Sequence, residues 1–155
     1  MRNTLFILLL IFQLPFEGQS QTVIKMKREG GVSIIPCKVN GLNLNFIFDT
    51  GASDVSISLM EASFMLKNGY LEKSDIIGTS NYIDATGKLS EGVNIILKEI
   101  EIAGLKLFNV KASIITNIKA PLLLGQSAIS KLGKIEIDLK LNTITILNGK
   151  GAYDY

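Results

Sequence analysis

The chain has 155 residues, with 16 Lys and Arg against 14 Asp and Glu, one Cys and no His. Without histidine there can be no Ser-His-Asp triad, Cys-His pair or histidine-ligated metal, and the lone Cys37 can form neither an intrachain disulfide nor a thiolate metal site. The net charge of +2 comes from scattered lysines rather than a basic block, so we expect no nucleic-acid partner. Any chemistry therefore has to come from carboxylates, lysines and hydroxyls.

The N-terminal segment has the pattern of a secretory signal peptide. Arg2 precedes the large apolar residues 5–12, and small residues at Gly18 and Ser20 supply a cleavage site. The apolar run is too short to span a bilayer comfortably. We expect residues 1–20 to be a signal peptide and the mature protein to be exported to the periplasm, the cell surface or the medium, with no stable membrane span. A buried N-terminal helix or strand and an uncleaved signal anchor are the alternatives.

Residues 21–155 are enough for one domain with a single core. Short β-branched runs separated by Gly and Asn predict an all-β domain. Asn40-Gly41, between apolar runs at 32–39 and 42–48, predicts a hairpin, and the apolar surroundings of Cys37 predict a buried thiol. Further strands are expected at 93–97, 100–103, 107–115, 134–139 and 143–147, with Gly104 and Asn142 as turn residues.

Two segments are predicted to be helical. Ser58 and Glu61 have the spacing of a capping box, and apolar positions follow up to a stop at residues 68–69. A shorter helix is expected to begin with Ser127 as its N-cap and to end at Gly133. The domain should therefore carry one or two short helices beside its strands.

Asp49 is the carboxylate whose position solubility does not explain. It follows the apolar residues 46–48 and precedes a turn of small residues, 50–53. A buried carboxylate is costly unless it is paired or hydrogen-bonded, and the backbone N–H groups of Gly51 and Ala52 are near enough in sequence to bind it. The alternative is an Asx turn, in which Asp49 only caps its own backbone at the end of a strand.

The segment 48–53, Phe-Asp-Thr-Gly-Ala-Ser, resembles the active-site loop of aspartic peptidases. A second segment, 122–129, resembles the apolar-apolar-Gly motif and following helix of their single-lobe, retropepsin-like branch, with Leu124 and Gly125 in the motif. Residues 134–146 are similar to the closing strands of that branch. The resemblance, which spans roughly 23–147, implies an all-β, single-lobe acid-protease fold: a closed β-barrel.

The resemblance also implies a mechanism. A chain with a single Asp-Thr-Gly can form a catalytic dyad only with a second copy, so we expect a homodimer in which Asp49 and its symmetry mate share one proton and activate water against a polypeptide substrate. Thr50 would hydrogen-bond across the two-fold axis, Gly51 and Ala52 would support the loop, and Leu124 and Gly125 would support it from the second motif. No metal or cofactor is required.

The family covers its substrate with a flap. The weakly patterned stretch 81–92 is predicted to be a mobile hairpin or loop, and by position residues 82–88 are the candidate flap, with Tyr82 shielding the site and Thr86 and Gly87 at its hinge or tip. An exposed turn is the alternative.

The sequence departs from the retroviral pattern at Ser53, Asp54 and Gln126, which stand where retroviral members often carry acidic residues and an Arg. The terminal strands that interleave in those dimers are not identifiable, because 149–155 is polar and turn-like. Two other functions stay open: a binding or regulatory domain that keeps the fold without turnover, and an extracytoplasmic structural β-domain.

Overall fold

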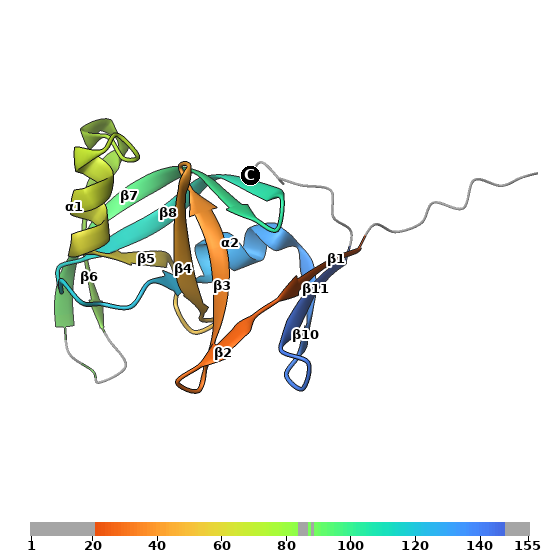
Figure 1. The fold of residues 1–155 in the computed structure, drawn as a ribbon. Helices are drawn as coiled ribbons and strands as arrows, with labels where there is room; N and C mark the ends of the chain where they lie inside the picture. Colours follow the sequence, from red (N-terminus) through yellow and green to blue (C-terminus); the bar gives the residue numbers. More distant parts are fainter. Residues whose placement is uncertain (1–20, 84–86, 88, 148–155) are drawn as a thin grey trace, which may run out of the picture.

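The computed structural model describes residues 21–83, 87 and 89–147, and the predicted signal peptide at 1–20 lies outside them. Figure 1 shows strands that curl around a short internal helix, with a longer helix at one end. The strands are β1 (Gln21–Lys25), β2 (Lys27–Glu29), β3 (Val32–Val39), β4 (Leu42–Phe48), β5 (Val55–Ser58), β6 (Ile76–Ile83), β7 (Leu89–Ile102), β8 (Leu105–Ile115), β9 (Leu123–Leu124), β10 (Lys134–Asp138) and β11 (Thr143–Leu147). The helices are α1 (Leu59–Lys67) and α2 (Gln126–Ile129), with 3₁₀ turns η1 (Lys73–Asp75) and η2 (Ser130–Leu132).

Eight strands form one sheet in the order β2-β3-β4-β9-β5-β8-β7-β6. An additional antiparallel pairing joins β3 to β7, with Val39 opposite Ile100, and closes six of these strands into a ring. The closed, all-β, single-lobe barrel expected from the sequence is confirmed. A separate three-stranded sheet, β1-β11-β10, extends from one side of the barrel (Figure 1).

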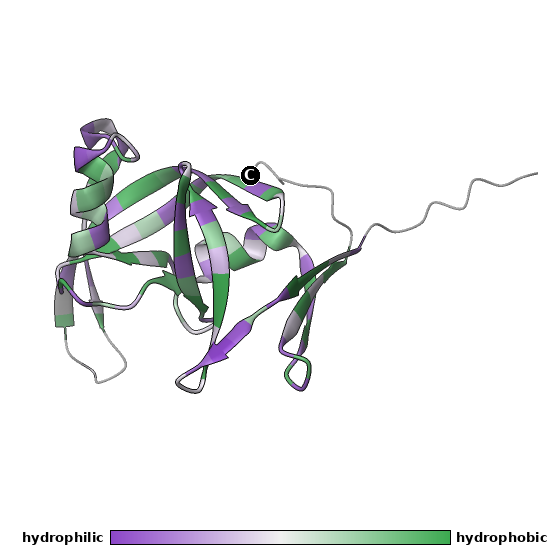
Figure 2. Ribbon diagram, viewed as in Figure 1, coloured by the Kyte–Doolittle hydropathy of each residue, from purple (hydrophilic) through white to green (hydrophobic). Residues whose placement is uncertain are grey.

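The predicted turns are confirmed by their backbone angles. Asn40 and Gly41 have φ of 47° and 94°, the left-handed values that a two-residue hairpin requires between β3 and β4. Gly104 (φ 85°) turns β7 into β8, and Asn142 (φ 54°) precedes β11. Figure 2 shows polar and apolar bands alternating along β3 and β4, which is the pattern of strands with one buried face.

Some strand predictions were wrong in extent. Residues 93–97 and 100–102 belong to one continuous strand, β7, because Glu99 stays paired with Phe108 of β8 and no turn forms between the two segments. Ala103, expected at the end of the second segment, lies in the turn that follows β7. The stretch 81–92 was predicted to be a hairpin or a loop. Its described residues belong to a hairpin whose arms are the ends of the strands β6 and β7. The strands β1, β2, β5, β6 and β9 were not predicted.

The first helix is confirmed and the second begins differently from the prediction. Ser58 caps α1 by accepting hydrogen bonds from the backbone N–H groups of Met60 and Glu61 at 3.1 and 3.3 Å. The N-cap of α2 is Gly125, not Ser127. The prediction was wrong because the Ser127 hydroxyl bonds to other strands, as described below. Gly133 (φ 76°) ends η2, as expected.

The core fills the barrel and continues under the helices. Its largest fully buried side chains come from β3, β4, β5, β7, β8, β9, β11, α1 and the segment after α1: Phe46, Ile35, Ile57, Met65, Leu71, Ile95, Leu97, Ile100, Ile102, Leu107, Leu124 and Ile144. Cys37 is buried, as predicted, and burial raises the pKa of its thiol to about 12.

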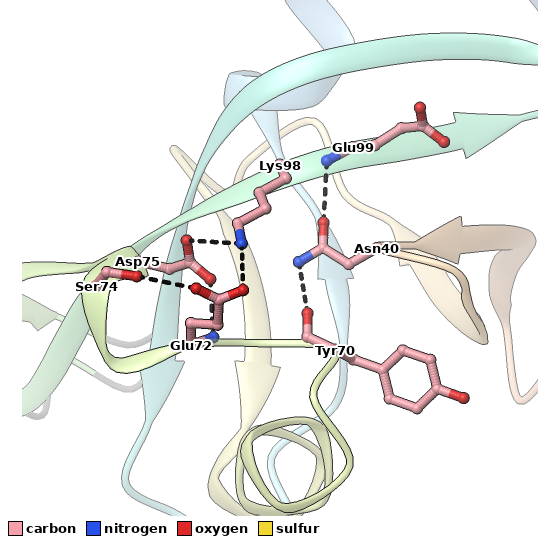
Figure 3. A network of polar contacts seen from close by, with 7 residues as sticks. All are labelled: Asn40, Tyr70, Glu72, Ser74, Asp75, Lys98 and Glu99. Carbon is pink, nitrogen blue, oxygen red and sulfur yellow. Dashed lines mark hydrogen bonds and ion pairs between the residues drawn. The ribbon is translucent and has the colours of Figure 1, made fainter.

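A polar network joins the segment after α1 to the barrel (Figure 3). The Asn40 side chain donates to the Tyr70 carbonyl at 2.7 Å and accepts from the Glu99 N–H at 2.9 Å, so one amide links three separate segments. Lys98 pairs with Glu72 at 2.8 Å, which raises the pKa of Lys98 and lowers that of Glu72. Because both of these side chains are exposed, the pair adds little stability, and the Asn40 bonds are the firmer link.

Candidate active site

Asp49 lies at the end of β4, in a loop held by hydrogen bonds. Its N–H donates to the Leu124 carbonyl at 3.2 Å, which extends the parallel β4–β9 pairing by one step. Asp49 Oδ1 accepts a hydrogen bond from the Gly51 N–H at 2.9 Å, and the Ala52 N–H lies 3.4 Å from the Asp49 carbonyl oxygen. The side chain is half-buried. The Asx-type bond is therefore present, and it fixes the orientation of the carboxylate at the surface of the barrel.

The second glycine motif lies directly against this loop. The backbone N–H groups of Gln126 and Ser127 donate to the carbonyls of Ala52 and Ser53 at 2.8 and 3.0 Å. Leu124 is fully buried in the core beneath. Segments more than seventy residues apart in the chain thus form one unit, and Thr50, which is exposed, projects from it.

Gly125 allows this contact because there is no space for a larger residue. A Cβ placed on it would overlap the Asp54 carbonyl group and lie 2.8 Å from the Ala52 carbonyl oxygen. Gly51 is less restricted, since a Cβ there would lie 3.3 Å from Asp49 Oδ1. Glycine is therefore required at Gly125 by the approach of two backbones rather than by a left-handed φ.

Three further polar side chains stabilise the same unit. No such role was predicted for them from the sequence. Gln126 Nε2 donates to the Thr50 carbonyl at 2.8 Å. Lys111 of β8 forms an ion pair with Asp54 at 2.9 Å. Gln126 and Asp54 were noticed only as departures from the retroviral pattern, and no local signal marks Lys111.

Ser127 connects this unit to two strands. Its hydroxyl accepts a hydrogen bond from the Val55 N–H at 2.9 Å and donates to the Lys111 carbonyl at 2.7 Å. The parallel pairing of β5 with β8 brings these two groups together. This is why Ser127 does not cap α2: its hydroxyl bridges strands that are distant in sequence.

The flap candidate begins at the end of β6 and precedes β7, and these two strands pair as a hairpin. Tyr82 is in β6, Gly87 is in the connection, and Thr86 lies outside the described residues. The Tyr82 hydroxyl donates to the Glu91 carbonyl at 3.1 Å, and its ring lies so close to Gly92 that a Cβ there would overlap it. These contacts keep Tyr82 against its own hairpin, and its predicted shielding role stays a prediction.

No group of three or more carboxylate or thiol side chains among residues 21–83, 87 and 89–147 is arranged to hold a metal ion. A hollow of about 290 Å³ is lined by Pro36, Cys37, Lys38, Asn43, Leu44, Asn45, Glu101, Ala103 and Gly104. None of these residues belongs to the Asp49 loop or to the second glycine motif. This hollow is therefore separate from the candidate active site.

Comparisons with known proteins agree with the fold and the loop. Residues 35–131 match the family described as "gag-polyprotein putative aspartyl protease". The crystal structure of a retropepsin-like aspartic protease from Rickettsia conorii is similar to the chain with a TM-score of 0.59 and 24% identity, over 81% of this chain and 98% of that one. At this identity the likeness shows the fold alone. A comparison with curated proteins finds no match. Because the family match spans more than half of the chain and includes both the Asp49 loop and Gly125, the chain belongs to this family of retropepsin-like aspartyl proteases.

Proposed function

We propose that this protein is an aspartic endopeptidase whose active form is a homodimer with one Asp49 from each chain at its centre. The observation that carries the proposal is the Asp49 loop, which the Gly51 N–H and the second glycine motif hold in one conformation at the barrel surface. The match to an aspartyl protease family supports the same activity. Because the chain carries one such loop and no histidine, a second copy is the source of the second carboxylate.

The chemistry is hydrolysis by a single water molecule. The ionised member of the Asp49 pair takes a proton from the water, whose oxygen attacks the scissile carbonyl carbon, while the protonated member donates to the carbonyl oxygen. The resulting diol collapses, the C–N bond breaks, and the amine leaves with a proton from the dyad. Two like charges so close together are mutually destabilising, which keeps one proton on the pair. No acyl-enzyme forms.

Each chain supplies a loop that is already ordered for this role. The hydrogen bond from Gln126 to the Thr50 carbonyl and the backbone bonds to Ala52 and Ser53 are made within one chain. Dimerisation therefore has to align two ordered loops rather than fold them, which reduces the entropy cost of forming the site. Thr50, exposed beside Asp49, is placed by this proposal at the axis.

We also propose that the protein acts outside the cytoplasm. The support is the pattern of residues 1–20: a positive charge, an apolar run and a small-x-small site. None of the helices in the described part of the chain has the length and apolar character needed to cross a membrane.

The test uses the full chain at pH 4–7 with a library of unstructured peptides, cleavage being read by mass spectrometry. Asp49→Asn should lower the cleavage rate by about a thousandfold or more while leaving thermal unfolding unchanged. Glu136→Gln makes the same carboxylate-to-amide change at an exposed position in β10 and should keep full activity.

Subunit mixing tests the dimer. Adding excess Asp49→Asn protein to a fixed amount of wild type should inhibit cleavage as mixed dimers form, and sedimentation should show dimers at the concentrations where activity appears. Full cleavage by Asp49→Asn would refute the proposal. A wild type that stays monomeric and cuts nothing would instead favour a binding or regulatory domain.

A further inference from the structure

Four polar side chains cross the sheet in a line from β5 to β6. Ser56 of β5 lies opposite Ser113 of β8, and Ser113 lies opposite Asn94 of β7. Ser80 of β6 is diagonal to Asn94. The hydroxyls of Ser80 and Ser113 both donate to Asn94 Oδ1, at 3.0 and 3.3 Å. We call Ser56, Ser113, Asn94 and Ser80 the polar row.

The polar row shares a face of the sheet with Asp49. Ser56 pairs with Leu123 of β9, and Leu123 pairs with Ile47 of β4. Directly paired residues point to the same side of a sheet, and side chains alternate along a strand. Asp49 is two residues beyond Ile47, so its side chain continues the face on which Ser56 lies.

The other face of these strands is the core. Val55 and Ile57 flank Ser56, Ala112 and Ile114 flank Ser113, and Ile95 follows Asn94; all five are 5% exposed or less. The polar row is therefore not a defect in the core. It is a polar strip on the side of the sheet that carries the catalytic candidate.

The distance between Ser56 and Asp49 is suitable for binding a substrate side chain near the scissile bond. Adjacent strands lie ~4.8 Å apart and residues along a strand advance ~3.3 Å, so two strand spacings and two residues put Ser56 on the order of 10 Å from Asp49. An extended peptide advances by a similar rise for each residue. A side chain within three residues of the scissile bond would reach the polar row.

The row has unused hydrogen-bonding capacity. Ser56 is 6% exposed, and its hydroxyl oxygen is buried with no hydrogen-bond partner among the residues that the structure describes. Such groups are rare because water no longer satisfies them. Asn94 uses its Oδ1 twice, whereas its Nδ2 donates to none of the described residues. Among the described residues, a hydroxyl and an amide N–H without partners thus lie two strand spacings apart, on either side of Ser113.

We propose that the polar row is a substrate subsite for an uncharged, hydrogen-bonding side chain, such as Asn, Gln, Ser or Thr, within three residues of the scissile bond. This inference rests on the proposed peptidase function and adds a substrate preference to it. The row carries no charge, and nearby Lys111 is already paired with Asp54. A charged side chain would lose its hydration without gaining a counter-ion, and an aliphatic one would leave the Ser56 hydroxyl unsatisfied.

The test compares Ser56→Ala with wild type on matched peptides that carry Asn or Leu at each of the three positions on either side of the cleaved bond. Wild type should cleave the Asn peptide about tenfold better at one position. Ser56→Ala should lose this preference while keeping or raising its thermal stability, because it deletes an unsatisfied buried hydroxyl. Ser63→Ala, on the exposed face of α1, is the matched control and should retain the preference.

A second measurement separates failure of the subsite from failure of the function. The labelled Asn and Leu peptides are titrated into Asp49→Asn protein, and binding is followed by fluorescence polarisation. Tighter binding of the Asn peptide, lost in the Ser56→Ala background, supports the subsite even if wild type cleaves nothing. Cleavage with equal rates for the two peptides refutes the subsite and leaves the peptidase proposal intact. Equal or absent binding without cleavage also refutes the subsite.

Discussion

The Gly125 backbone lies against the Asp54 carbonyl group, so closely that a single added methyl would overlap it. This contact brings the two motifs of the sequence together: Gly125 opens α2, and Asp54 follows the Asp49 loop. The N–H groups of Gln126 and Ser127 then reach the loop carbonyls at hydrogen-bond distance. The geometry of Asp49 therefore depends on a residue 76 positions away whose side chain is a hydrogen atom.

Gly125→Ala should destabilise the protein and disorder the Asp49 loop. The added methyl must push apart two backbones that cannot rotate away, and overpacking of this kind costs about 1–3 kcal/mol. Urea unfolding should show the loss of stability. Relative to wild type, hydrogen exchange should become faster at 50–53 and should change less in β7. Ser53→Ala, an exposed change in the same loop, should leave both measurements near wild type. An unchanged loop in Gly125→Ala would show that the contact can relax at no cost.

Gln126→Leu should lower activity more than stability. The substitution keeps a side chain of similar size but removes the N–H donor to the Thr50 carbonyl. An exposed hydrogen bond contributes about 1 kcal/mol or less to unfolding. Imprecise placement of Thr50 and Asp49 should lower kcat by about tenfold with KM little changed. Equal kcat values for Gln126→Leu and wild type would contradict a positioning role.

Asn40→Ala should cost about 2–3 kcal/mol of unfolding free energy. The change leaves the Tyr70 carbonyl and the Glu99 N–H without their partner and places Ala at φ 47°. Asn40→Gly accepts the same φ and loses only the two hydrogen bonds, so it should lose less unfolding free energy than Asn40→Ala. The difference between the two variants separates the cost of the backbone angle from that of the hydrogen bonds. Asn43→Ala, exposed on β4, should be nearly neutral in the same denaturation series. Loss of the network should also speed hydrogen exchange at 68–75.

The buried Cys37 thiol should make stability depend on alkaline pH. Burial raises its pKa from 9.0 to about 12, so the folded protein keeps the proton that the unfolded chain releases. The contribution to stability is complete below about pH 9 and is lost as the pH rises towards 12. Urea-unfolding curves taken between pH 8 and 11 should show the unfolding free energy of wild type falling as the pH rises. In Cys37→Ala the part of this fall that comes from the thiol should disappear. If the unfolding free energy fell equally with pH in both proteins, the pH dependence would come from groups other than Cys37.

The same burial predicts slow thiol chemistry. At neutral pH a maleimide should label native wild-type protein far more slowly than protein in urea, because the thiol is both protonated and covered. Labelling in the folded state at the unfolded rate would show that the β3–β4 hairpin opens readily.

Several features could be predicted from the sequence because their causes are local. Asn40-Gly41 can adopt the positive φ angles of a tight turn, and the Ser58 hydroxyl reaches amides only two and three residues ahead. The strand-turn motif around Asp49 places a carboxylate at the end of an apolar run, and the structure gives it the expected hydrogen bond from Gly51. The closed barrel was predicted through resemblance to a family rather than from these local signals.

Other features depend on pairings that no short segment encodes. Ser127 has the composition of a helix cap, but β5 and β8 are brought next to it only when the sheet is assembled, and there its hydroxyl bonds to both. Lys111 finds Asp54, and Ser56 comes into line with Asn94, through registers set by the burial of whole strand faces. By itself, the sequence determined the turns, the first helix and the loop that carries Asp49, since those rest on backbone angles and near neighbours. Only the tertiary structure decided what braces that loop and which polar side chains share its face, because strand pairing joins residues whose separation in the chain carries no signal of their contact.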